Sequence, residues 1–431
     1  MSISTSLLDR YLAGLNEEPC LRGACIIGQS GGPTAVINAS ALGAIQAALQ
    51  SPCITHVYGA ANGIEGILNG RLYDMEQEDP EELELLRQTP ASALGSCRYK
   101  MADPSEDDAD YRRLLKVFRR YGVRYFFYNG GNDSMDTCHK ISRFLELSGY
   151  ACRVVGIPKT IDNDLAGTDH SPGFASAAKF IATSCMEVNQ DVRVYGTGRV
   201  TIVEIMGRHA GWLAGSAALA GYAGAGPDLV YLPEAPFDMN AFFSDVERTY
   251  RERGSCMVAV SEGIRHADGR FVAEAMTNDK DVFGHVQLGG LASMLAETVK
   301  NNMGMKVRGI ELSLLQRCAS HVASATDVEE AYEAGRAAVA AAVGGASGKM
   351  VAFERGQENG KYLCLLTLVD LSEAANAEKL VPRSWINSAG NGVEQAFIDY
   401  VLPLIQGDLA PATQNALPRF ARLKKIPASL P

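Results

Sequence analysis

The sequence predicts an α/β fold with two domains, each a mostly parallel sheet with helices on both faces. Short apolar runs typical of buried strands alternate regularly with amphipathic helical stretches along the chain. The length of 431 residues exceeds what a single hydrophobic core usually supports. A long helical stretch begins after residue 173, and we expect the second domain to start there.

The composition argues against several classes of protein. Apolar residues make up 47% and charged residues 21% of the chain, which is an ordinary globular composition. The net charge of −10 argues against a nucleic-acid partner, because phosphate backbones need a basic face. The ten cysteines form no Cys-x-x-Cys pair, so we expect reduced thiols rather than disulfides or a zinc site. With neither a secretory signal nor a membrane-spanning stretch in the sequence, we expect a soluble, cytoplasmic protein without a membrane partner.

The first strand is expected at residues 24–28, and it leads through the loop 29–34 into a helix at 37–49. A strand, a glycine loop and a helix together offer free backbone N–H groups to an anion. A plain tight turn explains Ser30-Gly31-Gly32 equally well. Further elements are expected as a strand at 56–59, an acidic surface helix at 74–90 and a helix at 107–121 whose acidic residues precede its basic ones.

Two loops that follow neighbouring strands carry the chemistry of the first domain. Strand 124–128 opens into a glycine-rich loop with Asp133, and strand 154–157 opens into the stretch 158–164. This second loop contains Lys159, Asp162 and Asp164. Ligands bind outside the carboxyl ends of parallel strands, so we expect these four side chains to share one crevice.

The second half repeats the pattern of a strand that ends in polar residues. Arg208 and Glu262 follow two of its strands and suit a phosphorylated or hydroxylated ligand. His209 is better explained as a packed histidine than as a catalyst. The expected elements are strands at 199–205, 229–232, 257–261 and 307–315, helices at 175–188 and 291–304, and an alanine-rich helix capped by Thr326-Asp327 that ends at Gly344-Gly345.

Taken in order, these motifs resemble the pyrophosphate-dependent branch of the phosphofructokinase family, and the similarity covers nearly the whole chain. The stretches Thr160 to Asp164 and Met206 to Arg208 are the most specific. The full series is Ser30-Gly31-Gly32, Gly95-Ser96-Cys97-Arg98, Gly130 to Ser134, Pro158 to Asp164, Met206-Gly207-Arg208, Ser261-Glu262-Gly263 and Leu315-Gln316-Arg317.

The resemblance implies two similar three-layer αβα domains, with the phosphoryl donor and fructose 6-phosphate on opposite sides of a cleft. Residues 1–170 plus about 327–383 would form the pyrophosphate domain, and 171–326 plus about 384–431 the fructose 6-phosphate domain. The implied reaction is a reversible, Mg²⁺-dependent transfer from pyrophosphate to the 1-hydroxyl of fructose 6-phosphate. A homodimer or homotetramer is implied, because arginines of this kind reach the sugar phosphate from a neighbouring subunit.

The same resemblance assigns roles to individual residues. Asp162 would accept the proton of the 1-hydroxyl, with Lys159 and Asp133 as further catalytic residues, and Arg199 and Arg317 would grip the 6-phosphate. The sugar-binding set is Thr160, Ile161, Asp162, Arg199, Met206, Gly207, Arg208, Glu262, Leu314, Gln316 and Arg317. Pyrophosphate would contact Gly31, Arg98, Asp133 and Ser134, and Mg²⁺ would lie at Asn132 and Asp133, although most relatives have an aspartate where this chain has Asn132.

Two positions point to the donor. ATP-using relatives have glycine where this chain has Asp133 and Lys159. A carboxylate at position 133 takes the space and charge of a nucleotide α-phosphate, and the ammonium at 159 can neutralise a small donor. These residues favour pyrophosphate over the alternative of an ATP-dependent 6-phosphofructokinase. The intact Asp162 argues against a second alternative, a non-catalytic regulatory subunit of the same fold.

Overall fold

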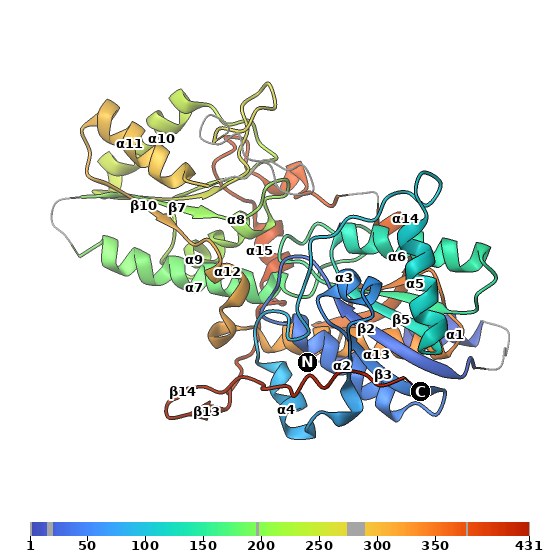
Figure 1. The fold of residues 1–431 in the computed structure, drawn as a ribbon. Coiled ribbons are helices and arrows are strands. Elements are labelled where there is room, and N and C mark those ends of the chain that lie inside the picture. Colours follow the sequence, from blue (N-terminus) through green and yellow to red (C-terminus); the bar gives the residue numbers. More distant parts are fainter. Residues whose placement is uncertain (1, 15–19, 195–197, 274–288, 376–377, 431) are drawn as a thin grey trace.

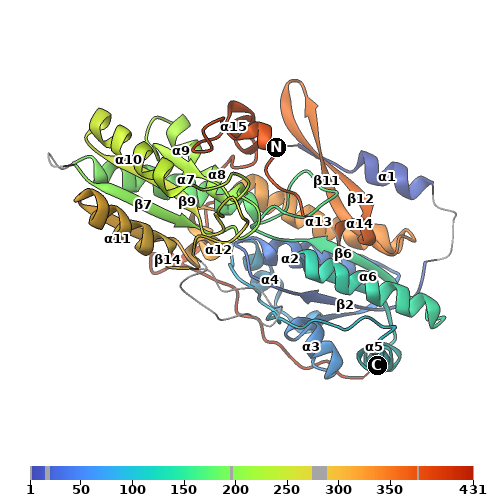
Figure 2. The ribbon, with the colours of Figure 1, turned by 90° about the horizontal axis from the view of Figure 1, so that it is seen from above.

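Two β-sheets organise the chain in the computed structural model, which describes residues 2–14, 20–194, 198–273, 289–375 and 378–430 (Figure 1). The larger sheet has eight strands in the order β1-β12-β11-β6-β5-β2-β3-β4. The smaller sheet has four strands in the order β10-β7-β9-β8. Helices cover both faces of each sheet (Figures 1 and 2), so the predicted α/β class with two three-layer units is confirmed.

The centre of the larger sheet is parallel, and its antiparallel pairs lie toward the edges. β6, β5, β2 and β3 pair in parallel, whereas β3 pairs with β4 and β11 with β12 in the antiparallel sense. The strands span Ser2–Ser4 (β1), Gly23–Gln29 (β2), Ile54–Ala60 (β3), Leu72–Asp74 (β4), Val123–Gly130 (β5), Arg153–Pro158 (β6), Lys349–Glu358 (β11) and Lys361–Asp370 (β12).

The central strands β2, β5 and β6 are mostly apolar because both of their faces are buried. In β2, Cys25 and Ile27 pack under α2 and α13, whereas Ala24 and Ile26 pack on the opposite face. The covering helices are α1 (Ser6–Ala13), α2 (Ile37–Gln50) and α13 (Ala325–Val343) on one face, and α3 (Gly63–Leu68), α5 (Ala109–Arg120), α6 (Asn132–Leu147) and α14 (Leu371–Ala374) on the other.

The smaller sheet is parallel and also buried on both faces. Val203 and Ile205 of β7 pack against one helical layer, and Val200 and Ile202 pack against the other. Its strands are β7 (Val200–Ile205), β8 (Leu229–Tyr231), β9 (Cys256–Ser261) and β10 (Val307–Glu311). The first layer holds α7 (Phe174–Val192), α8 (Trp212–Ser216), α9 (Ala218–Tyr222) and α15 (Gln395–Val401), and the second holds α10 (Met239–Arg253) and α11 (Leu291–Met303).

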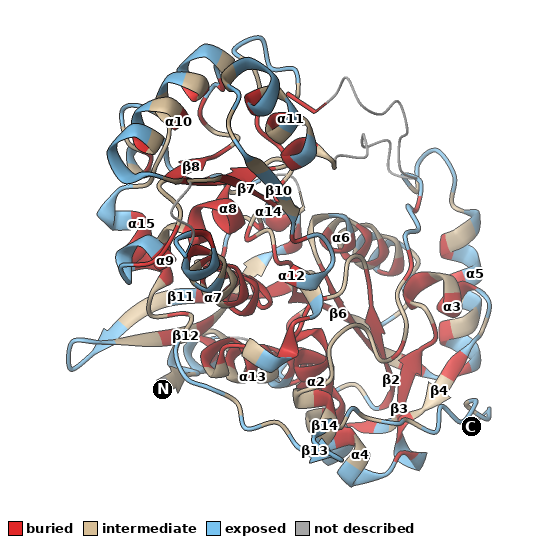
Figure 3. Cartoon of the chain, turned by 90° about the vertical axis from the view of Figure 1, so that its left-hand side faces the viewer, coloured by how far each residue is buried: buried red, intermediate tan, exposed pale blue. Residues whose placement is uncertain are grey.

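The rest of the described chain consists of short helices, short strands and loops. Figure 3 shows that the buried residues concentrate in the two sheets and the inner helix faces, while the tip of the β11–β12 hairpin is exposed. The remaining elements are α4 (Pro80–Glu84), α12 (Leu315–Cys318), β13 (Thr413–Gln414), β14 (Leu417–Pro418) and the 3₁₀ helices η1 (Met75–Gln77), η2 (Leu85–Arg87), η4 (Ser320–Val322) and η5 (Arg383–Trp385).

Three expectations about single elements were wrong. The acidic stretch 74–90 is not one helix but η1, α4 and η2, because Asp79 caps a new helix whose first residue is Pro80. Helix α13 is capped by Ser324, whose Oγ accepts the backbone N–H of Asp327. The strand expected at 307–315 ends at Glu311, where the chain turns into α12.

The expectation of reduced thiols was also wrong at one place, because Cys20 and Cys53 form a disulfide. Cys20 precedes β2 and Cys53 precedes β3, and these strands are parallel neighbours that begin at the same edge of the sheet. Cys20 and Cys53 are 33 residues apart in the sequence, so the spacing of the cysteines did not indicate this disulfide. The other eight cysteines are free thiols.

The end of the chain lies against the larger sheet's half. The backbone N–H groups of Lys424 and Lys425 donate to the Glu78 carboxylate at 2.7 Å, and Gln88 bonds to the backbone of Ala412 in both directions. The domain boundaries expected from the sequence, which put residues 384–431 with the sugar domain, remain a prediction. Within the described residues, no helix has both the length and the apolar character needed to span a bilayer.

Candidate active site

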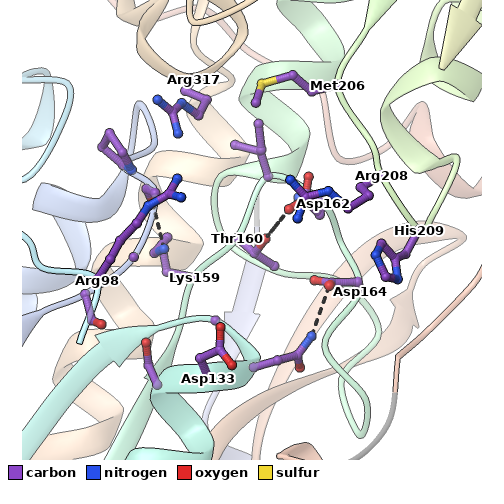
Figure 4. A pocket seen from close by; sticks show the side chains of 18 of the residues that line it. Arg98, Asp133, Lys159, Thr160, Asp162, Asp164, Met206, Arg208, His209 and Arg317 are labelled. Atoms are coloured by element: carbon purple, nitrogen blue, oxygen red, sulfur yellow. Dashed lines mark hydrogen bonds between the residues drawn. The ribbon is translucent and has the colours of Figure 1, made fainter. Parts of the chain in front are cut away.

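A cavity of about 350 Å³ lies between the two halves of the chain and is lined by both (Figure 4). Residues that follow β2, β5 and β6 form the side that belongs to the larger sheet. Residues that follow β7 and β9, together with α12, form the other side. Every one of these strands thus contributes its carboxyl end, where parallel sheets bind ligands.

Most of the residues singled out from the sequence lie in this cavity. The larger sheet's half contributes the polar residues Gly31, Arg98, Asn132, Asp133, Ser134, Lys159, Thr160 and Asp162 and the apolar Ile161. The smaller sheet's half contributes Met206, Arg208, Glu262 and Arg317. Arg199, Gly207, Leu314 and Gln316 do not line it.

Arg199 lies at the wrong end of its strand to reach the cavity of its own chain. It precedes β7, whereas Met206 and Arg208 follow that strand. A strand of this length separates the two ends by roughly 20 Å, at about 3.3 Å per residue.

The other three residues outside the cavity lie next to it. Gln316 is buried, and its side chain accepts the N–H of Met206 at 3.2 Å and donates to the carbonyl of Ser313 at 3.1 Å. It therefore fixes α12 to the end of β7. Gly207 adopts a φ of 134°, which suits glycine, and Leu314 is exposed to solvent.

Lys159 lies at the floor of the cavity, between the loops after β2 and β6. Its side chain is 3% exposed, and its Nζ donates to the carbonyl of Gly32 at 2.7 Å. Burial lowers its pKa to about 8, against the opposing effect of Asp162. The ammonium is thus held beside the glycine loop that follows the first strand, where the sequence predicted an anion.

Asp162 is half-buried and opens into the cavity. The Thr160 hydroxyl oxygen accepts a hydrogen bond from the backbone N–H of Asp162 at 3.1 Å. The same hydroxyl donates to the Asp162 carboxylate at 3.4 Å. Burial raises the pKa of this carboxyl, while Lys159 opposes the shift. A carboxylate with a raised pKa is a stronger proton acceptor than an ordinary aspartate, which suits a general base.

The first turn of α6 supplies part of the cavity wall. Asp133 is exposed there, whereas Ser134, the next residue, is buried. Figure 4 shows Asp133 on the same side of the cavity as Asp164 and Lys159. The helix begins at Asn132, so its N-terminal N–H groups also face this region.

Asn132 and Asp164 form a pair across the two loops. The Asn132 side-chain amide donates to Asp164 Oδ2 at 3.0 Å, while Asn132 Oδ1 has no hydrogen-bond partner in the described part of the chain. Burial and the charge of Asp162 raise the pKa of Asp164 to about 7. Across the described ranges, no three His, Cys, Asp or Glu side chains are grouped as metal ligands.

Glu262 faces Asp162 from the other half of the chain. Its Oε1 accepts the N–H of Gly207 at 3.3 Å, and burial raises its pKa to about 7. A Cβ atom on Gly263 would lie 2.1 Å from the carbonyl oxygen of Arg208, so the two loops meet only because this residue is glycine. Glu262 and Arg208 together offer one acceptor and several donors to a polyhydroxylated ligand.

The residues Asp164, His209 and Glu378 also line the cavity, although sequence reasoning assigned them no role. Asp164 was expected in the crevice but given no function, His209 was taken as a packed residue, and Glu378 was not considered. His209 Nδ1 lies 3.3 Å from Glu378 Oε2. A role for Asp164 could have been inferred from its position two residues after Asp162. No local sequence pattern marks Glu378, which lies in the segment where the chain passes from the larger to the smaller sheet.

A buried network holds the loop that carries Asp162. The Asn163 amide donates to the Tyr400 hydroxyl at 2.9 Å, and its Oδ1 accepts the Ser171 N–H at 3.0 Å. His170 lies between Asp169 at 2.9 Å and Glu330 at 2.7 Å. The loop is therefore bonded to α13 through Glu330 and to α15 through Tyr400, two helices that are distant from it in the sequence.

Comparison with known proteins agrees with this geometry. The family profile described as "Phosphofructokinase" matches residues 24–310. A protein of Halomonas elongata named pyrophosphate–fructose 6-phosphate 1-phosphotransferase is 45% identical over 92% of this chain and 95% of its own length. A sulfofructose kinase of Alkalicoccus urumqiensis is 33% identical over 84% of this chain and 91% of its own length.

Solved structures show the same arrangement of elements. The crystal structure of a pyrophosphate-dependent phosphofructokinase from Marinobacter aquaeolei superposes with a TM-score of 0.85. That protein is 41% identical, and the match covers 95% of this chain and 98% of the other.

Proposed function

Since this chain belongs to the phosphofructokinase family, we propose that it is a pyrophosphate-dependent phosphotransferase acting on fructose 6-phosphate. It moves a phosphoryl group from pyrophosphate to the 1-hydroxyl and yields fructose 1,6-bisphosphate and phosphate. The observation that carries the donor assignment is Lys159, whose buried ammonium bonds to the glycine loop of the cavity that Asp133 also lines.

The residue roles follow from their positions in the cavity. Pyrophosphate would bind between Gly31, Arg98, Lys159 and Ser134, where backbone N–H groups and cations neutralise its charge. The sugar would lie toward the smaller sheet, with its hydroxyls on Arg208 and Glu262. Asp162 would then accept the 1-hydroxyl proton while that oxygen attacks the nearer phosphorus and phosphate leaves.

Magnesium fits the donor set near the start of α6. Asn132 Oδ1 is buried and has no partner in the described residues, and the Asp164 carboxylate is bonded to the same side chain. Mg²⁺ prefers oxygen ligands and often uses only one or two from the protein. Asn132 and Asp164, with Asp133 nearby, would hold the ion together with pyrophosphate oxygens. When bound, the ion would neutralise charge on the phosphoryl oxygens.

The assembly and the compartment are part of the same proposal. A homodimer or homotetramer would bring Arg199 of one subunit to the cavity of another, which its own chain cannot do. The small, water-soluble substrates suit the cytoplasm.

Purified protein with Mg²⁺ and fructose 6-phosphate tests the proposal directly. We expect phosphate release and fructose 1,6-bisphosphate with pyrophosphate, and turnover with ATP that is at least a hundredfold lower. The reverse reaction should proceed from fructose 1,6-bisphosphate and phosphate at a comparable rate. Equal or greater use of ATP would contradict the donor assignment, and no turnover with either donor would favour a regulatory subunit.

A further inference from the structure

A short segment beside the cavity ties the loop that carries Asp162 to the smaller sheet's half. It comprises residues 378–381, where the chain passes from the larger to the smaller sheet. The backbone N–H of Lys379 donates to the carbonyl of Asp164 at 2.8 Å, and its carbonyl accepts the indole N–H of Trp212 at 2.8 Å. Trp212 begins α8 and belongs to the core of the smaller half. Lys379 therefore bonds to both halves through its backbone alone.

The ammonium of Lys379 makes three more contacts with the same loop. Its Nζ lies 2.6 Å from the carbonyl oxygen of Asp169, 3.2 Å from that of Thr168 and 3.4 Å from Asn163 Oδ1. Three oxygen acceptors match the three donors of a charged ammonium. The Nζ also lies 5.3 Å from the centre of the Trp212 ring, which a cation favours. Charge-assisted hydrogen bonds thus hold the loop in addition to the backbone bond.

The rest of the segment bonds to two loops of the smaller sheet's half. Glu378 Oε2 lies 3.3 Å from His209 Nδ1. The backbone N–H groups of Val381 and Gly211 both donate to Glu234 Oε1, at 3.0 and 2.8 Å. His209 and Gly211 belong to the loop after β7, which also carries the arginine on the sugar side of the cavity. The segment therefore fixes the loop of the general base relative to the loop that would hold the sugar.

We propose that Lys379 is a positioning residue for phosphoryl transfer, which places the Asp162 carboxylate against the 1-hydroxyl of a sugar bound on the other half. This inference rests on the proposed function. Lys379 does not line the active-site cavity, so it acts through the loop rather than on a ligand. A displacement of about 1 Å between reacting groups can lower a rate about 100-fold. The side chains that bind the sugar would stay in place.

The effect on turnover is separated from the effect on binding in Lys379→Met. With pyrophosphate as the donor, we expect kcat to fall about 10- to 100-fold. The Kd of fructose 6-phosphate, measured by calorimetry, should change less than about threefold. Lys379→Arg keeps the charge, and a second cavity of about 550 Å³ beside Lys379 leaves room for the larger head group. This variant should recover kcat to within about fivefold of wild type.

A double variant tests whether Lys379 acts through Asp162. In Asp162→Asn the base is already gone, so adding Lys379→Met should lower kcat by less than about threefold more. The matched control is Lys179→Met on α7, because Lys179 also donates to a backbone carbonyl, that of Gly407, at 2.6 Å. Thermal unfolding is followed for every variant. The control should keep kcat within about twofold of wild type even if its Tm falls as far as that of Lys379→Met.

Several results would overturn the inference. These are an unchanged kcat in Lys379→Met, a Kd of fructose 6-phosphate that rises as much as kcat falls, additive effects with Asp162→Asn, a Lys379→Arg protein no more active than Lys379→Met, or an equal loss of kcat in the control. If Lys379→Met fails to fold, Lys379→Gln replaces it, because its amide can still donate to one carbonyl but carries no charge, and the same results are expected. A wild-type protein that does not turn over pyrophosphate would contradict the proposed function and this inference with it.

Discussion

Lys159 and Asp162 act on each other because they share a site with little solvent. The ammonium is buried, so its pKa falls to about 8, and the carboxyl beside it has a raised pKa for the same reason. Each charge opposes the effect of burial on the other group, because the carboxylate favours the charged lysine and the ammonium favours the charged aspartate. The cavity therefore offers a cation for the donor and a base for the acceptor three residues apart in sequence.

The general base is tested by Asp162→Asn. The amide cannot accept the hydroxyl proton, and a placed base is typically worth about 10²–10⁴-fold in rate. We expect kcat to fall by that amount while the fold and the Kd of fructose 6-phosphate stay close to wild type. Turnover above a tenth of wild type would remove Asp162 from this role.

The pH dependence of donor use tests Lys159. Its lowered pKa means that the charged form is lost as pH rises through about 8 rather than 10.5. We expect kcat/KM for pyrophosphate to fall above pH 8 because the free enzyme then lacks this cation. Pyrophosphate itself titrates in this range, so the measurement is the ratio of wild type to Lys159→Met across pH 6.5–9.5. A flat ratio would assign the fall to the substrate alone.

Donor choice is tested by removing both distinguishing residues. Two unit charges about 4 Å apart repel by about 4 kcal/mol at an effective dielectric constant near 20, so Asp133 should exclude a nucleotide phosphate. We expect Asp133→Gly with Lys159→Gly to raise the ratio of ATP to pyrophosphate kcat/KM at least a hundredfold. Lys159→Gly alone should impair pyrophosphate use without creating ATP use, and an unchanged ratio in the double variant would refute the assignment.

At the scale of elements, local patterns predicted the strands and the loops that follow them. The apolar runs ending at Gly28, Tyr128 and Ile157 became β2, β5 and β6, and their polar loops meet in the cavity. This worked because side-chain burial on both faces leaves a continuous apolar signal. The hairpin of β11 and β12 was missed although its Asn359-Gly360 turn, with a positive φ at both residues, is a local hairpin signal. The Cys20–Cys53 pair was missed because neighbouring residues do not encode such a long-range contact.

The network around His170 gives an element-scale prediction about stability. Burial would lower the pKa of His170, but Glu330 on α13 and Asp169 outweigh it and raise the value to about 9. A raised histidine pKa contributes stability that is complete below about pH 6.5 and is lost as pH rises through 9. We expect the Tm to fall between these values in wild type, and to fall less in His170→Gln. If Tm fell equally with pH in wild type and His170→Gln, the result would contradict a contribution of His170 to the pH dependence of stability.

At the scale of the whole molecule, the larger and smaller sheets each complete only part of the site. Residues after β6 and β9 face each other across the cavity, so the chemistry depends on how the two halves are held. The chain crosses between them repeatedly, with α13 returning to the larger sheet and α15 to the smaller. The sequence predicted two domains but not the path of residues 411–428, because the residues that hold this segment, such as Glu78 and Gln88, are far from it in the sequence.

Arg199 supplies the last prediction, because the cavity of one chain cannot contain it. If the arginine acts in catalysis, it must come from a second subunit, most simply across a two-fold axis. Asp162→Asn and Arg199→Ala proteins should each be nearly inactive alone. Mixed under conditions that allow subunits to exchange, they should regain activity, because one of the two sites in a mixed dimer then has both residues intact. For random exchange at equal amounts, about a quarter of wild-type activity is the upper limit, since half of the dimers are mixed and each has one working site. Mixed dimers that form, as shown by tagged subunits, but remain inactive would place Arg199 outside the neighbouring site.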